Sequence, residues 1–392
     1  RLYTNKVALD LTRTATQIDN MSDALTSRRA EMELRLRRAV GALERLDIVG
    51  YEKERRRRLA SSSSSVPAIL EPPFTRRQPP GPPEDFSVVA ADGSHIDVDR
   101  HMAANCFLIN IGVAALHYGS QPDARLYSKP KLYAKDEELV IRDPVTYRQQ
   151  TIEGAVLGAK RTVEEIRELV EAVRHTPSDR PTLVLIDGSL VMLGLVGPLN
   201  QDFVLRELVE DGFVRALDEL REIARTRPIV VAGYISLPGS FEVISAIRAM
   251  TCPYEPEGAG YRCGPTGPGR EACDTCLGGV RDRNLFARTL GPLDRSALFG
   301  AGSTSVEQYY MGTDVVFFYV NAGEEIGRVE VPSWVAREPE LLGLAHTLVV
   351  DQCIRGRGYP IALMEAHEQA VVSGSDRRHF CELVDGALQR DG

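Results

Sequence analysis

Two short segments of the sequence each place an aspartate directly after an apolar run that reads as a β-strand. The segments cover residues 88–94 and 183–189, and both end in Asp-Gly-Ser. A carboxylate is costly to bury unless it is paired or metal-bound, so each aspartate is expected at the exposed end of its strand. On neighbouring strands, Asp92 and Asp187 would converge and could hold hard divalent cations beside a phosphodiester. The alternative interpretation is that Asp-Gly only begins a turn.

A third carboxylate is expected from the helix that precedes the second aspartate. Residues 156–174 have helical periodicity, and their valines and isoleucine define a buried face. Glu164, Glu165 and Glu168 are the candidates on this helix. Glu165 lies nearest the edge of the buried face, so it is the first choice, with Glu168 as the second. The alternative is that all three are solvated helix charges.

The elements that must position these carboxylates follow an α/β order. Strands are predicted at 87–91, at 103–117 (one strand or a pair) and at 138–141, followed by the helix at 156–174 and a buried strand at 182–186. This β-β-β-α-β order outlines a ribonuclease H-like sheet. Further along, the pattern predicts helices at 204–225, 340–355 and 361–372 and strands at 229–234, 315–320 and 327–331.

The first 85 residues differ in composition from the rest of the chain. Residues 1–60 contain a long amphipathic helix in our prediction, from about residue 18 to residue 60, which could dimerise or dock a partner. Residues 61–85 are rich in serine and proline and are predicted to be a linker or surface strap. The main domain then covers residues 86–392, with a Cys-rich insertion at 250–282.

Composition and charge limit the classes of function. The chain has 392 residues, enough for one large domain with an appendage or for two domains. Its net charge of −8 argues against a surface that is basic throughout, so any contact with nucleic acid must be local. No apolar run reaches the length of about 18 residues that a membrane span needs, and no signal peptide is recognised. We therefore expect a cytoplasmic protein without a membrane partner.

Four of the seven cysteines lie close together in the Cys-rich insertion. In a reducing compartment, clustered thiols indicate metal binding rather than disulfides. The spacing C-x10-C-x9-C-x2-C, in a loop rich in glycine and proline, suits a tetrahedral thiolate site. Structural zinc is the first choice, an iron–sulfur cluster the second and unliganded thiols the third. The ligands would be Cys252, Cys263, Cys273 and Cys276.

Several dispersed segments resemble the NurA nuclease family in its bacterial form. In the family's order they are Ala-Asp-Gly-Ser at 91–94, Ile-Asp-Gly-Ser-Leu at 186–190, Ala-Gly-Tyr-Ile-Ser at 232–236, Phe-Phe-Tyr at 317–319, Arg-Val-Glu-Val-Pro at 328–332, Gly-Tyr-Pro at 358–360 and Glu-Ala-His at 365–367. The resemblance covers the chain from about residue 86 to its end. It implies a ribonuclease H/PIWI-like fold, in which helices flank a mixed sheet.

For function, the resemblance implies a manganese-dependent DNA nuclease that is both a single-strand endonuclease and a 5′-to-3′ exonuclease. It further implies a homodimer that acts with a HerA-type hexameric translocase in DNA end resection for double-strand break repair. Asp92, Asp187 and Glu165 would hold two manganese ions, with magnesium as an alternative. His367 would be a late metal ligand or a proton donor.

Further polar residues could complete this site. The family often places a basic residue directly after the serine at Ser236, but Leu237 follows here, and Arg248 on the next helix is a candidate substitute for the missing cation. His95 and Asp97 are close enough in sequence to the first aspartate to support it, although a turn or an outward-facing strand position explains them equally well.

Two other classes of function fit parts of this pattern. One is a catalytically silent adaptor that keeps the ribonuclease H-like fold and serves the same ATPase. The other is the actin/sugar-kinase architecture, in which an Asp-Gly turn meets phosphate. That second class predicts ATP binding by this chain alone, and no Gly-rich P-loop motif supports a related NTPase.

Overall fold

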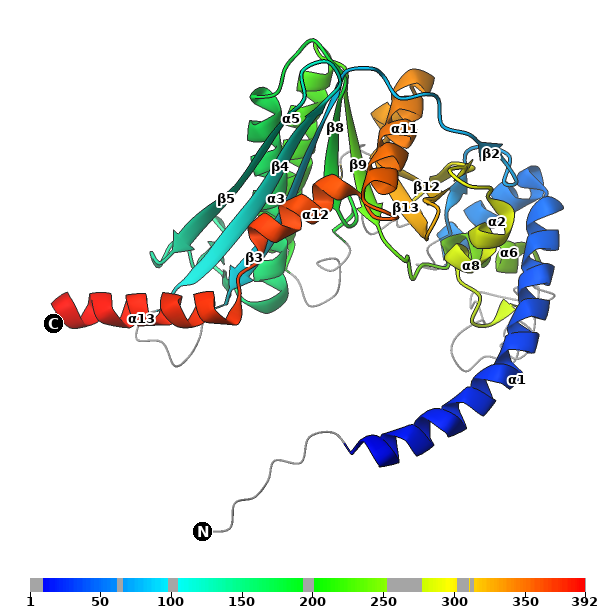
Figure 1. Cartoon of the computed structure of the whole chain (residues 1–392), viewed down its shortest axis with the longest axis horizontal. Coiled ribbons are helices and arrows are strands. Elements are labelled where there is room, and N and C mark those ends of the chain that lie inside the picture. Colours follow the sequence, from blue (N-terminus) through cyan, green and yellow to red (C-terminus); the bar gives the residue numbers. More distant parts are fainter. Residues whose placement is uncertain are drawn as a thin grey trace.

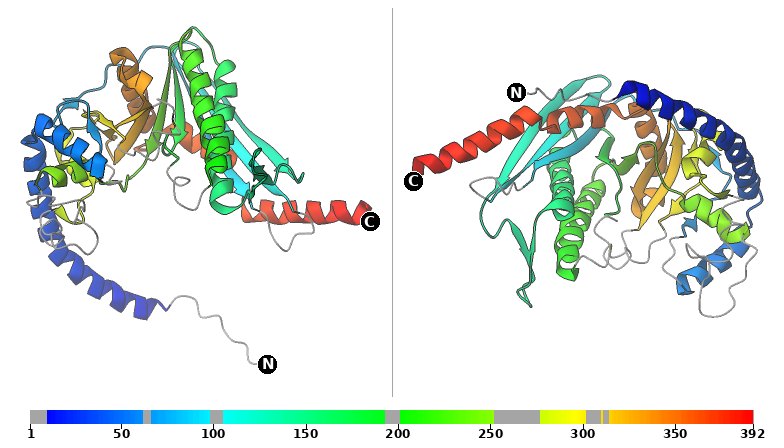
Figure 2. Two further views of the ribbon diagram at one scale, coloured as in Figure 1. Left: turned by 180° about the vertical axis from the view of Figure 1, so that it is seen from behind. Right: turned by 90° about the horizontal axis from the view of Figure 1, so that it is seen from below.

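The computed structural model describes residues 10–61, 66–97, 105–192, 201–251, 277–301, 310 and 314–391. One mixed sheet forms the centre of the molecule, and helices cover both of its faces (Figures 1 and 2). Its long strands are β3 (Phe86–Ile96), β4 (Phe107–Tyr118), β5 (Asp123–Tyr133), β8 (Thr182–Asp187), β9 (Ile229–Ile235), β12 (Val315–Asn321) and β13 (Ile326–Pro332). None of the helices in the described ranges combines the length and apolar character that a membrane crossing requires.

Five of these strands form the ribonuclease H-like half of the sheet, in the order β5-β4-β3-β8-β9. The strand β4 is antiparallel to both of its neighbours, whereas β3, β8 and β9 run parallel to one another. The predicted α/β class with a mixed ribonuclease H-like sheet is therefore confirmed. Beyond β9 the sheet continues through β13 and β12, each antiparallel to the strand before it.

Short strands extend the far end of the sheet. They are β1 (Ala68–Ile69), β2 (Arg76–Arg77), β10 (Arg295–Ser296) and β11 (Phe299–Gly300), while β6 (Val140–Arg142) and β7 (Gln149–Thr151) form a separate hairpin. The strands β1 and β2 lie in the Ser/Pro-rich segment 61–85, so part of this predicted linker pairs with the sheet. Each of the two is only two residues long, which fits the high proline content around them.

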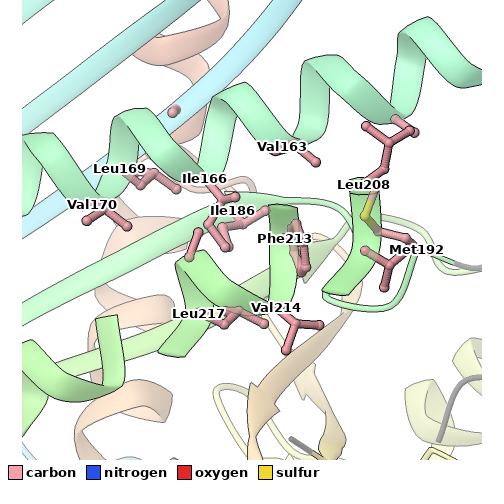
Figure 3. Close-up of a cluster of buried hydrophobic side chains, with 14 of the residues drawn as sticks. Val163, Ile166, Leu169, Val170, Ile186, Met192, Leu208, Phe213, Val214 and Leu217 are labelled. Carbon is pink, nitrogen blue, oxygen red and sulfur yellow. The ribbon is translucent and has the colours of Figure 1, made fainter. Parts of the chain in front are cut away.

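Helices on the two faces of the sheet bury alternate residues of its strands. One face carries α3 (Gly154–Arg174) and a continuous helical segment made of α4 (Asp202–Leu205), the π-helical stretch η2 (Arg206–Val214) and α5 (Arg215–Ala224). The other face carries α11 (Pro339–Arg355) and α12 (Ile361–Ala370), and a last helix, α13 (Gly374–Asp391), follows. Val89 and Val184 belong to the core on the α3 side, whereas Val88 and Leu183 belong to the core on the α11 side. Figure 3 shows the α3 side, where Val163 and other α3 residues meet the π-helical segment.

The N-terminal region forms two helices rather than the single one predicted. These are α1 (Leu11–Glu44) and α2 (Ile48–Ser61), and α1 packs against α6 (Glu242–Thr251) and α8 (Asp282–Thr289). The side chain of Asp47 accepts hydrogen bonds from the backbone N–H groups of Val49 and Gly50, both at 3.1 Å. This capping begins a new helix and explains the break.

The strand predictions were wrong at two points. β3 does not end at Asp92 but continues to Ile96, because β4 pairs with it along its whole length. The third strand of the meander is β5 (Asp123–Tyr133) rather than residues 138–141. Because β5 is an exposed edge strand that contains Pro130, it lacks the apolar pattern by which a strand is recognised.

Gly112 on β4 allows α12 to lie directly against the sheet. A Cβ atom at this position would be 2.2 Å from the carbonyl oxygen of Ala366 and 2.3 Å from the nitrogen of Ala370. We expect Gly112→Ala to lower the free energy of unfolding by about 1–3 kcal/mol, because the helix must move away. Gly158→Ala on α3 is the matched control, since nothing lies within 4 Å of its added methyl group. It should stabilise the helix by up to about 1 kcal/mol. Urea denaturation measures both, and equal stability of the two variants would contradict this packing.

Candidate active site

Asp92 and Asp187 lie side by side where β8 ends. The last pair in the parallel register joins Ala91 to Ile186, so the two aspartates occupy the next position on adjacent strands. Because side chains alternate along a strand, both carboxylates face the α12 side, as do Ala90 and its neighbour Leu185 two residues earlier. β8 stops here while β3 continues, which leaves this flank of β3 without β8 as a neighbour.

Glu165 approaches the two aspartates from α3. It is buried, with 6 % of its surface exposed. Gly93 makes room for it, since a Cβ atom there would be 2.5 Å from Glu165 Oε1. Burial raises the pKa of Glu165 to about 7. The Arg161 guanidinium, whose Nε lies 2.9 Å from Glu165 Oε1, lowers this pKa, whereas the charges of Asp92 and Asp187 raise it further. The three carboxylates therefore share one electrostatic environment.

Glu164 and Glu168 take part in ion pairs away from this point. Lys129 Nζ on β5 donates a 2.5 Å hydrogen bond to Glu168 Oε2. Arg167 Nη1 donates a 3.2 Å hydrogen bond to Glu164 Oε1. Of the three glutamates proposed for the site, the structure brings only Glu165 to the aspartates.

His367 projects from α12 onto Asp92. Its Nδ1 atom lies 2.6 Å from Asp92 Oδ2, and the rest of the side chain is largely exposed. Because a carboxylate oxygen accepts hydrogen bonds, the ring donates through Nδ1–H, and Nε2 takes no part in this contact. The end of α12 is fixed to the sheet because the Ser94 hydroxyl donates to the Ala370 carbonyl at 2.5 Å and the Asn110 amide donates to it at 3.0 Å.

Tyr359 was not predicted as a site residue. It lies in the turn between α11 and α12, and its hydroxyl donates a hydrogen bond to Asp187. Loss of hydration raises the pKa of Asp187, the Tyr359 hydrogen bond lowers it, and the charge of Asp92 raises it again. The signal in the sequence was Gly-Tyr-Pro at 358–360, which belonged to the resemblance but carried no assigned role.

A buried carboxylate on β13 fixes the backbone that follows Asp187. Glu330, which is 1 % exposed, accepts hydrogen bonds from the Ser189 hydroxyl at 2.7 Å and from the Leu190 N–H at 2.8 Å. Arg328 Nε donates to the other oxygen of Glu330 at 2.8 Å, and the same guanidinium pairs with Glu242 at the start of α6. Sequence reasoning missed this support, although Arg-Val-Glu at 328–330 was among the segments of the resemblance.

The other residues that the sequence suggested for the site contact different parts of the chain. His95 lies near Arg161, and burial lowers its pKa. The Ser236 hydroxyl donates to Glu325 Oε2 at 2.7 Å. Arg248 Nη2 donates to the Leu277 carbonyl at 3.0 Å, so this guanidinium supports the chain beside α6. Asp97 has a partner of its own.

The predicted thiolate site falls outside the described residues. All four of its cysteines, Cys252, Cys263, Cys273 and Cys276, lie in the range 252–276. Zinc or an iron–sulfur cluster at this position stays a prediction. The other three cysteines are free; Cys106 and Cys353 are buried and Cys381 is half-buried.

The chemistry of the carboxylate site fits a hard divalent cation. Carboxylate oxygens with one imidazole nitrogen are a common donor set for such ions. Burial, and to a lesser extent the charges of the neighbouring carboxylates, raise the pKa values of Glu165 and Asp187, and a bound cation would offset both effects. As the side chains stand, no group of three or more His, Cys, Asp or Glu within the described ranges could hold one ion together. Arg161 and His367 contact oxygens of Glu165 and Asp92, so a cation would compete with these partners.

The raised pKa of Glu165 predicts a pH dependence of stability. Its pKa is about 7 in the folded chain against an ordinary value of 4.5, so the unfolded chain releases this proton first as the pH rises. The free energy of unfolding should therefore fall by up to about 3 kcal/mol from about pH 4.5 to about pH 7, in the absence of metal. Glu165→Gln should remove this loss, so that the free energy of unfolding of the variant increases relative to that of the wild type as the pH rises. Urea denaturation in EDTA across this range tests it, with the exposed Glu222→Gln as control. A constant difference between Glu165→Gln and wild type would contradict it.

The sheet order and the acidic residues at the end of β8 define a ribonuclease H-like protein with a carboxylate site. A family model described as NurA domain matches residues 86–372. The chain belongs to the NurA family, which confirms the resemblance found in the sequence.

Comparison with solved structures gives three further findings. The catalytic domain of human endonuclease V is 13 % identical, with a TM-score of 0.32 over 86 % of this chain and 96 % of that one. Argonaute of Aquifex aeolicus is 9 % identical, with a TM-score of 0.27, and the match covers 75 % of this chain and 29 % of that one. The type 1 ribonuclease H LC9-RNase H1 is 10 % identical, with a TM-score of 0.22, and the match covers 43 % of this chain and 69 % of that one. No match was found among the curated proteins compared with this sequence.

Proposed function

We propose that this chain is a metal-dependent deoxyribonuclease that cleaves single-stranded DNA. Membership of the NurA family indicates a nuclease-type function. The observation that carries the finer proposal is that Asp92 and Asp187 lie side by side on adjacent strands, with Glu165 near enough that their charges raise its pKa. Three carboxylates together suit the hydrolysis of a phosphodiester, in which divalent cations balance negative charge.

Each residue of the site has a role in this proposal. Asp92, Asp187 and Glu165 would hold manganese, with magnesium as an alternative. Bound ions would polarise the phosphate and lower the pKa of the attacking water. His367 is held by Asp92 through Nδ1, so its Nε2 can bind a cation or exchange a proton with the reacting groups. Tyr359 orients Asp187 through its hydrogen bond.

The substrate and the partners come from the family and from the shape of the site. Asp187 and His367 are exposed at the sheet edge, which supports a polymer substrate that passes over the surface. We extend the proposal to single-strand endonuclease and 5′-to-3′ exonuclease activity in DNA end resection, with a HerA-type hexameric translocase. The exposed apolar residues Leu11, Ile18 and Met21 on α1 support a contact with that translocase or with a second copy of the chain.

A catalytically silent adaptor of the same translocase is the second candidate. The contacts of Arg161 and His367 with the carboxylates favour it, because they already provide partners for the negative charge. Incubation of the full chain with circular and linear single-stranded DNA separates the two functions. We expect cleavage of both in manganese and none in EDTA. No cleavage in manganese, with or without the translocase, would contradict the nuclease and support the adaptor.

A further inference from the structure

The loop that follows β9 presents two apolar side chains to solvent at the same edge of the sheet as the carboxylates. Leu237 is 59 % exposed and Phe241 is 61 % exposed. Asp187 is paired with Tyr234 in the parallel register, and Leu237 is three residues further along. Its Cα atom therefore lies at most about 16 Å from that of Asp187, from the strand spacing and the reach of the chain. A single strand of DNA covers such a distance in a few nucleotides.

This loop is held in place by contacts from several sides. Arg283 Nη1 donates to the Leu237 carbonyl and Arg281 Nη1 donates to the Gly239 carbonyl, both at 2.9 Å. The N–H of Asp282 donates to the Ser240 carbonyl at 3.1 Å. Ser240 Oγ and the hydroxyl of Tyr319 share a 2.7 Å hydrogen bond. The backbone that carries the exposed side chains of Leu237 and Phe241 is therefore held in place.

Leu237 also has a backbone conformation that a leucine rarely adopts. Its φ angle is +43°, in the left-handed region that favours glycine. Single exposed apolar residues are ordinary, but a strained one on a fixed loop that also carries an exposed phenylalanine near a candidate active site needs a reason. Packing within the fold does not supply this reason, since most of the surface of both side chains is exposed.

Two cations contact the loop that carries these apolar side chains. The guanidinium groups of Arg281 and Arg283 each donate to one loop carbonyl. Because a guanidinium has five N–H donors, each group keeps further donors that can contact a phosphate. Aromatic side chains that alternate with cations are typical of surfaces that bind single-stranded nucleic acid. Arg281 and Arg283 also place positive charge next to the loop where the family's basic residue is replaced by Leu237.

We infer that Leu237, Phe241, Arg281 and Arg283 form a stacking rim for single-stranded DNA next to the cleavage site. Bases near the scissile phosphate stack on Phe241 and pack against Leu237, while the two arginines contact the flanking phosphates. The inference rests on the proposed nuclease function and adds how the substrate strand is held. A rim of this kind favours unpaired bases, because the faces of paired bases are covered by their stacked neighbours.

Binding without cleavage tests the stacking rim. The affinity of the full chain for a fluorescent single-stranded oligonucleotide is measured by anisotropy in EDTA. We expect Phe241→Ala to weaken binding about tenfold, as for the loss of one stacked base. Tyr147→Ala is the matched control, because this tyrosine is 82 % exposed and lies in the hairpin of β6 and β7, which is separate from the main sheet, and its loss should leave affinity unchanged.

Two further variants separate binding from folding. Phe241→Trp should keep the affinity, and DNA should quench its added indole fluorescence; the chain has only one other tryptophan. Leu237→Gly removes the side chain at a position where glycine is unstrained, so the melting temperature should stay the same or rise while DNA binding weakens. Arg281→Gln can still donate to Gly239 but loses its charge, which should reduce the slope of log K against log salt by about 0.7.

The outcomes are distinguishable. If the wild type binds single-stranded DNA and the Phe241→Ala and Leu237→Gly variants bind it equally well, the stacking rim is wrong while the nuclease proposal stands. If the wild type binds no DNA at all, the proposed function fails together with the inference. Weakened binding in both variants, with a quenched indole in Phe241→Trp, supports the rim.

Discussion

Asp187→Asn should lower the rate of manganese-dependent cleavage of single-stranded DNA by about a thousandfold, which corresponds to several kcal/mol of lost charge stabilisation. The substitution keeps the shape of the side chain and an oxygen that can accept from Tyr359. It removes one of the negative charges that would attract the cations. Single-turnover cleavage of a labelled oligonucleotide, at saturating protein, measures the rate without a contribution from binding.

Two controls complete this prediction. Asp218→Asn on the exposed side of α5 changes the net charge by the same amount and should leave the rate unchanged. Binding of single-stranded DNA by Asp187→Asn in EDTA should equal or exceed that of the wild type, since a repulsive charge is lost. A rate within a few-fold of wild type in Asp187→Asn would place the chemistry elsewhere.

Arg328→Met should lower the free energy of unfolding by about 3–5 kcal/mol, because it leaves the buried Glu330 and the half-buried Glu242 without their cation. Arg328 lies between Glu330 and Glu242, is itself buried, and its guanidinium lies 3.7 Å from the centre of the Phe317 ring. Glu330 in turn accepts hydrogen bonds from the Ser189 hydroxyl and the Leu190 N–H, which follow Asp187. We therefore expect cleavage to fall as well, under conditions in which the variant is still folded.

An exposed ion pair gives the matched control for this variant. Arg225 and Glu222 are in contact on the surface, with 65 % and 60 % of their side chains exposed. Arg225→Met should change the free energy of unfolding by less than about 1 kcal/mol. Equilibrium denaturation in urea compares the two. Similar small losses for both variants would show that Arg328 does not neutralise a buried cluster.

The parts of the fold that the sequence predicts are those whose pattern is local. β8 and β9 are buried apolar runs, and α3 has a regular apolar stripe, so each was located to within a few residues. The same stripe identified Glu165 as the glutamate closest to the buried face, and its burial follows from that position. The aspartates could be paired in advance because two Asp-Gly-Ser segments follow apolar strands.

The parts that escaped prediction depend on contacts between distant segments. β3 continues beyond Asp92 because β4 pairs with it, which no local pattern shows. β5 is a strand through pairing alone, since it lies exposed at the edge of the sheet. Glu330 reaches Ser189 across 141 residues of sequence, and Tyr359 reaches Asp187 from a turn. Such partners have no signature in spacing, so only the folded chain reveals them.

The proposed function depends on the binding of divalent cations by Asp92, Asp187 and Glu165 together. Electron paramagnetic resonance of free manganese, titrated with the full chain, measures this directly and without substrate. We predict that the wild type takes up manganese, that Asp92→Asn with Asp187→Asn abolishes the uptake, and that Asp218→Asn leaves it unchanged. Equal uptake by the wild type and the double variant, or no uptake by the wild type, would contradict the account.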